Sequence, residues 1–131
     1  MKKILIPTAI AFVTIILALV IFNKPAGTNP NSTQITNNVV LNGSTQTISI
    51  AAKGGYEPRN TTAKADTATT LKIQTSGTFD CSSSLIIPSL KYRKNLPPTG
   101  ETAVEIPPQK AGTTIRGLCS MGMYNFTLNF N

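Results

Sequence analysis

The chain has 131 residues, 12 basic and 5 acidic side chains, a net charge of +7 and no histidine. This length allows one domain plus a targeting segment. Because the commonest general base is absent and the acidic residues form no paired-carboxylate motif, we expect no enzymatic activity. We also expect no nucleic-acid binding, since the basic residues are scattered apart from Lys91, Arg93 and Lys94 on one predicted loop, without interleaved aromatic residues.

The N-terminus predicts a transmembrane helix that anchors the chain. Lys2 and Lys3 precede an almost wholly apolar run from Ile4 to Phe22. At ~1.5 Å per residue this run spans about 28 Å, close to the ~30 Å hydrocarbon thickness of a bilayer. We predict an uncleaved signal-anchor over residues 1–23, because its last residues are bulky where signal peptidase requires small ones. The basic start places the remainder on the extracytoplasmic face of the cell membrane; a cleaved signal peptide, the alternative, would release it as a secreted protein.

A flexible polar tether is predicted over residues 24–38, which are rich in Asn, Thr, Pro and Gly and nearly devoid of apolar side chains. From Val39 the composition changes to short runs rich in Val, Ile, Thr and Leu, separated by Gly and Pro residues. No apolar helical period persists along these runs. We therefore assign residues 39–131 to one all-β domain.

Seven runs in this domain are predicted strands: Thr45–Ala51, Asn60–Ala65, Thr69–Thr75, Cys81–Ile87, Ala103–Ile106, Thr113–Leu118 and Tyr124–Phe130. The last run is the clearest, because alternate residues from Tyr124 to Phe130 are large and apolar while those between them are polar. Short strands at this density, separated by turn residues, predict an antiparallel Greek-key β-sandwich.

One short stretch, Cys119-Ser120-Met121-Gly122-Met123-Tyr124, gathers one of the chain's two cysteines and two of its three methionines. Cys119 directly follows one predicted strand and Met123 precedes the next, so a tight loop holds both side chains near one end of the sandwich. Thiolate and thioether sulfur are soft donors that suit Cu(I). The loop therefore predicts a copper site in which Met121 is either a further donor or an inward-packed side chain.

The alternative for two cysteines in an exported domain is a disulfide between Cys81 and Cys119, which suits an oxidising compartment. A disulfide that closes a loop of roughly 40 residues stabilises a fold by about 3–4 kcal/mol in chain-entropy estimates. Asp80, next to Cys81, is expected to cap its loop rather than to face a metal. Tyr56, Tyr92 and the phenylalanines are expected in the core or at its rim.

From Gly54 to the C-terminus the chain resembles cupredoxin domains, specifically small bacterial cupredoxin-like domains that end in C-S-M-G-M-Y. The features that carry the resemblance are Gly55-Tyr56-x-Pro58, Thr75-x-Gly77, Ile87-Pro88-x-Leu90, Leu96-Pro97-x-Thr99-Gly100-Glu101, Lys110-x-Gly112-Thr113 and the closing hexapeptide Cys119 to Tyr124. The chain is also similar to the copper domain of cytochrome oxidase subunit II, in which a histidine precedes a comparable strand. The resemblance implies a cupredoxin-like sandwich.

The resemblance also implies a ligand set. Cys81 takes the place of the first ligand histidine of cupredoxins, Cys119 matches the cysteine ligand, and Met123 holds the last position of a shortened ligand loop; Met121 is an additional candidate. Blue-copper electron transfer depends on two histidines and one cysteine, and both imidazoles are missing here. We therefore expect Cu(I) binding through sulfur, for copper sequestration or for handover to a membrane copper transporter or oxidase.

Other interpretations stay open from the sequence. One is a metal-free surface β-sandwich that acts as an interaction module and is stapled by a Cys81–Cys119 disulfide. A second is a redox-active copper protein. A third is a reversible exchange between the disulfide and a Cu(I) site, since cysteines close enough to share a metal are also close enough to oxidise together.

Overall fold

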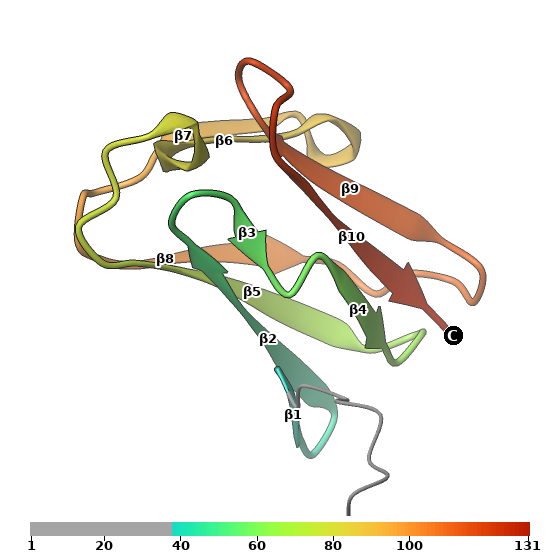
Figure 1. Cartoon of the computed structure of the whole chain (residues 1–131). Helices are drawn as coiled ribbons and strands as arrows, with labels where there is room; N and C mark the ends of the chain where they lie inside the picture. The colour runs from blue at the N-terminus through green and yellow to red at the C-terminus, as the bar shows by residue number, and fades with distance from the viewer. Residues whose placement is uncertain (1–37) are drawn as a thin grey trace, which may run out of the picture. The chain divides into compact units, whose positions relative to one another are not determined.

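Two five-stranded sheets pack face to face in the computed structural model, which describes residues 38–131 (Figure 1). The anchor predicted over residues 1–23 lies outside the described residues, as does the predicted tether apart from Asn38. Asn38 is hydrogen-bonded to the sandwich, since its side-chain amide donates to Thr61 Oγ1 at 2.7 Å and to Ser49 O at 3.2 Å. No helix within residues 38–131 has the length and apolar character needed to cross a membrane.

The first sheet has the strand order β1-β2-β5-β8, and β3 pairs with the end of β2. Its strands are β1 (Val39–Asn42), β2 (Thr45–Ala52), β3 (Tyr56–Glu57), β5 (Ala68–Thr75) and β8 (Gly100–Ile106). The second sheet has the order β4-β10-β9-β6-β7. Its strands are β4 (Asn60–Ala63), β6 (Ser84–Ile87), β7 (Tyr92–Asn95), β9 (Thr114–Cys119) and β10 (Asn125–Phe130). The all-β sandwich predicted from the sequence is confirmed.

The expectation of purely antiparallel pairing is wrong at two places. Strand β2 runs parallel to β5, and β4 runs parallel to β10. Parallel neighbours require a crossover connection. The chain supplies one by placing β4 in the opposite sheet between β2 and β5, so that β5 returns to the first sheet in the same direction as β2.

Three strands were not predicted, namely β1, β3 and β7. They lack an alternating apolar pattern because β1 and β7 are edge strands and β3 has only two residues. The basic group predicted on one loop is corrected accordingly: Arg93 and Lys94 lie in β7, and only Lys91 lies in the preceding turn, with a φ of 51°. Charged residues on an edge strand oppose pairing with another chain.

The core lies between the inner faces of the two sheets and follows the alternation of each strand. In β10 the predicted period of two is confirmed, because Phe126, Leu128 and Phe130 are fully buried. The Tyr56 ring packs edge-on against Phe126, with the ring centroids 5.1 Å apart. Gly117 lies opposite Phe126 on β9, where a methyl group added to the glycine would overlap the phenylalanine ring. These contacts fill the core directly below the end of β9 that carries Cys119.

Candidate metal centre

Cys81 lies in a one-turn 3-10 helix, η1 (Cys81–Ser83), immediately before β6. The strand predicted over Cys81–Ile87 therefore begins three residues later, at Ser84. Asp80 precedes the turn in an extended conformation and caps it, because its carboxylate accepts hydrogen bonds from the Ser82 amide at 2.8 Å and from the Ser82 hydroxyl. The capping role predicted for Asp80 is confirmed.

The same carboxylate also fixes a second loop beside η1. The Gly54 amide, in the loop between β2 and β3, donates to Asp80 Oδ2 at 2.9 Å. The hydrogen bond from the Ser82 side chain and then that from the Gly54 amide lower the pKa of Asp80 below its ordinary value. This connection joins residues 26 positions apart and had no signal in the sequence.

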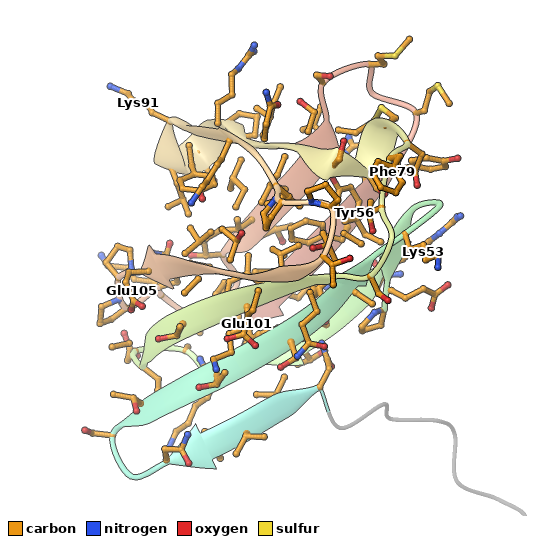
Figure 2. All side chains as sticks on the ribbon, turned by 90° about the vertical axis from the view of Figure 1, so that its left-hand side faces the viewer. Lys53, Tyr56, Phe79, Lys91, Glu101 and Glu105 are labelled. Carbon is orange, nitrogen blue, oxygen red and sulfur yellow. A yellow bond between two sulfur atoms is a disulfide. The ribbon has the colours of Figure 1, made fainter. Side chains whose placement is uncertain are left out.

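Tyr56 supports the turn from below. Its hydroxyl donates to Ser82 O at 3.1 Å, and its ring is buried between the two sheets (Figure 2). Burial, followed by the nearby charge of Asp80, raises the pKa of Tyr56 to about 12. The turn that carries Cys81 is therefore held by a cap at its start and by a core tyrosine under its middle residue. The prediction that Tyr56 lies in the core or at its rim is confirmed, whereas the same prediction is wrong for Phe79, which is 81% exposed.

Cys119 is the last residue of β9 and is 0% exposed. Strand pairing places it opposite Leu85 of β6, and the Ser120 amide donates to Ser84 O at 3.1 Å. The second sheet thus brings the end of β9 next to the turn that precedes β6. The Cα atoms of Cys81 and Cys119 lie 5.8 Å apart, and the two side chains form a disulfide. The disulfide considered as the alternative to a metal site is the state in this structure.

The loop between β9 and β10 stands above the end of the second sheet (Figure 1). It is closed by two backbone hydrogen bonds: the Cys119 amide donates to Tyr124 O at 3.0 Å and the Gly122 amide to Cys119 O at 2.9 Å. Gly122 has a φ of +71°, a backbone conformation that side chains with a Cβ rarely adopt. The Tyr124 amide donates to Cys119 Sγ at 3.4 Å.

The two methionines of this loop point away from the core. Met121 is 75% exposed and Met123 is 61% exposed, so the alternative in which Met121 packs inward is wrong. The structure thus brings Cys81 and Cys119 together and places both methionines, exposed to solvent, on the loop that begins at Cys119. Within the described residues, no three His, Cys, Asp or Glu side chains form a metal-binding group.

Two packed sheets of this topology, with a cysteine at the end of β9 that opens a short loop into β10, define a cupredoxin-like domain. A model of the cupredoxin-like domain matches residues 11–130, and the chain belongs to this family. No curated protein matches the sequence. The more distant similarity to cytochrome oxidase subunit II stays a prediction.

Solved structures with this fold include copper proteins. The metal-binding domain of the Cu(I)-exporting P-type ATPase CopA from Streptococcus pneumoniae D39, solved with Cu(I), superposes with a TM-score of 0.63 at 17% identity, over 71% of this chain and 92% of that chain. A copper-binding protein in its apo form has a TM-score of 0.64 at 22% identity, over 71% and 94%. Auracyanin B has a TM-score of 0.50 at 12% identity, over 72% and 95%. At these identities the similarity establishes the shared fold.

Proposed function

We propose that this chain binds Cu(I) through the sulfur atoms of Cys81 and Cys119 when both cysteines are reduced. The carrying observation is that the two Cα atoms lie 5.8 Å apart at one end of the sandwich. Side chains that can form a bond to one another need only a small separation of their sulfur atoms to admit one metal ion between them. Two thiolates offer a soft, anionic donor pair, which is the environment that Cu(I) prefers.

The methionines complete the donor set. Met123 and Met121 flank Gly122 on the loop that begins at Cys119, and both are exposed. Thioether sulfur is neutral and soft, so one methionine can turn toward the cysteine pair at little cost in burial. The chain has no histidine, and we therefore propose copper carriage rather than electron transfer or catalysis.

The cellular role follows from the proposed anchor. We assign residues 1–23 to a single membrane-spanning signal-anchor and residues 24–38 to a tether that holds the domain on the extracytoplasmic face. There the domain would sequester copper or pass it to a membrane copper transporter or oxidase. The metal-binding domain of a Cu(I)-exporting ATPase has the same fold, which supports a partner of this kind.

The second candidate function is a metal-free interaction module stapled by the Cys81–Cys119 disulfide, and the disulfide in this structure favours it. The two proposals differ in the state of the thiols in the cell. Mass spectrometry after thiol trapping in the cell envelope distinguishes them: a quantitative disulfide that does not respond to copper supply supports the structural module, whereas a fraction of free thiols that grows with copper supply supports the copper carrier.

The direct test is an anaerobic Cu(I) titration of the reduced full chain, kept in detergent because of its apolar N-terminal run, against a competing Cu(I) chelator. We expect one tightly held equivalent of Cu(I). Cys81→Ser and Cys119→Ser should each lower the affinity by at least 100-fold, whereas Ser120→Ala, an exposed position in the same loop, should leave it unchanged. Retention of the wild-type affinity by both cysteine variants would refute the proposal.

A further inference from the structure

The two sulfur atoms of the disulfide differ in their access to solvent. Cys119 is 0% exposed, beneath the β9–β10 loop, whereas Cys81 is only partly buried. The residues before Cys81 are at the surface: Asp80 is exposed, and Phe79 is 81% exposed and stands outside the sandwich (Figure 2). In the folded protein an external thiolate can therefore reach Cys81 but not Cys119.

The surroundings of Cys119 favour its departure as a thiolate. In thiol–disulfide exchange the attacked sulfur forms the mixed disulfide, and the other sulfur leaves with the electron pair of the broken bond. The Tyr124 amide already donates a hydrogen bond to Cys119 Sγ, and such a bond strengthens when the sulfur becomes anionic. It offsets part of the penalty of forming a charge at a buried site. Solvent access and stabilisation of the leaving thiolate thus both favour attack on Cys81 with Cys119 as the leaving group.

We propose that the Cys81–Cys119 disulfide is the closed state of the copper site and that a dithiol reductant opens it by attack on Cys81. This inference rests on the proposed function. A thiolate of the reductant bonds to Cys81 Sγ, the Sγ–Sγ bond breaks, and Cys119 leaves as a thiolate. The second thiol of the reductant then attacks the reductant's first sulfur, which is bonded to Cys81 Sγ in the mixed disulfide. Cys81 is released as a thiolate. The protein gains two electrons, and the reductant ends as a disulfide.

The closed state cannot hold Cu(I) tightly, because both anionic donors are consumed in the sulfur–sulfur bond. What remains at this end of the sandwich is the pair of exposed thioethers of Met121 and Met123, which are neutral. Without a cysteine thiolate, this end of the sandwich has no anionic sulfur donor to bind the cation. Reduction therefore gates copper loading, and the partner implied is a dithiol protein in the compartment that contains the domain.

The first experiment maps the site of attack and needs no copper. The oxidised full chain is incubated with a thioredoxin-type protein whose resolving cysteine is replaced by serine, so that the mixed disulfide accumulates, and the linked peptides are identified by mass spectrometry. We expect the link at Cys81. In parallel, each single variant leaves one thiol to react with an aromatic disulfide reagent. Cys81, the thiol left in Cys119→Ser, should react at least tenfold faster than Cys119, the thiol left in Cys81→Ser. The two rates should become equal in denaturant. A link at Cys119, or equal rates in the folded state, overturns the proposal.

The second experiment measures the gate. The oxidised and reduced full chains are titrated anaerobically with Cu(I) under the same competing chelator, and we expect at least a 100-fold weaker affinity in the oxidised form. Equal affinities overturn the gating. If neither form holds copper, the proposed function fails and the gating fails with it, while the order of attack is decided by the mapping alone.

Discussion

The backbone amide of Tyr124 donates a hydrogen bond to Cys119 Sγ at 3.4 Å, across the loop that connects β9 to β10. The bond holds the sulfur at the base of the loop that carries Met121 and Met123. The ring of Tyr124 also lies 3.6 Å from the position that a Cβ on Gly55 would occupy, so the ring is next to the turn between β2 and β3. The buried sulfur of Cys119 therefore has a hydrogen-bond donor from the chain itself.

The exposed methionines should tune copper affinity without affecting the fold. We expect Met123→Leu to weaken Cu(I) binding by about tenfold, equal to ~1.4 kcal/mol, because a neutral thioether is lost and the two thiolates remain. Met121→Leu should have an equal or smaller effect. Chelator competition on the reduced protein measures both values, with Ser120→Ala as the control. A loss as large as that of Cys119→Ser would show that the cysteine pair is not the principal ligand.

Tyr56 should make stability fall steeply at alkaline pH. Its pKa is raised from 10.0 to about 12, so the native state favours the neutral phenol. Its contribution is complete below the unfolded value near 10 and is lost as the pH rises through 12. Urea unfolding of the oxidised protein between pH 8 and 12 should show that the free energy of unfolding falls less with pH for Tyr56→Phe than for wild type. At neutral pH this variant should be destabilised by about 1 kcal/mol, because the hydrogen bond to Ser82 O is lost. Parallel alkaline profiles for the two proteins would contradict the burial of the phenol.

Asp80 should make stability fall at acidic pH. The hydrogen bonds from Ser82 and Gly54 lower its pKa below 3.8, so the native state favours the carboxylate. This contribution is present above the unfolded value and is lost as the pH falls through the folded one. Asp80→Asn keeps a side-chain oxygen for capping but removes the charge. We expect it to lower the urea midpoint at pH 7 and to differ less from wild type at pH 3. A difference of the same size at both pH values would exclude the charge as the cause.

Gly117 should tolerate no side chain. A Cβ at this position would overlap the Phe126 ring, which is itself held by the edge-on contact with Tyr56. We expect Gly117→Ala to destabilise the domain by about 1–3 kcal/mol, the usual range for overpacking. The double variant Gly117→Ala with Phe126→Leu should lose less than the sum of the two single variants, because the smaller residue makes room. Strictly additive losses in urea unfolding would contradict this packing.

The strands that face the core could be predicted from the sequence because burial on one face imposes an alternating pattern, as in β10 and β5. Strands β1 and β7 could not, since an edge strand with exposed residues carries no such pattern. The parallel pairing of β2 with β5 could not be predicted either, because the choice of neighbouring strand depends on a crossover through the other sheet rather than on local sequence.

The spacing from Cys119 to Met123 predicted a sulfur-bearing loop at one end of the sandwich, and its role in holding a metal stays a prediction. Its partnership with Cys81 came from the resemblance to cupredoxins, and the structure places the two cysteines in contact. The link between Asp80 and the Gly54 amide and the hydrogen bond from Tyr124 to Cys119 had no sequence signal, because both use backbone amides, which every residue other than proline possesses.

We propose that copper is held by sulfur from Cys81 and Cys119. X-ray absorption spectroscopy at the copper edge, on the reduced full chain loaded anaerobically with one equivalent of Cu(I), tests it most directly. We predict a Cu(I) edge and a first coordination shell of sulfur alone, with fewer sulfur ligands in Cys81→Ser and in Cys119→Ser. A shell dominated by nitrogen or oxygen, or a sulfur shell unchanged in both variants, would contradict it.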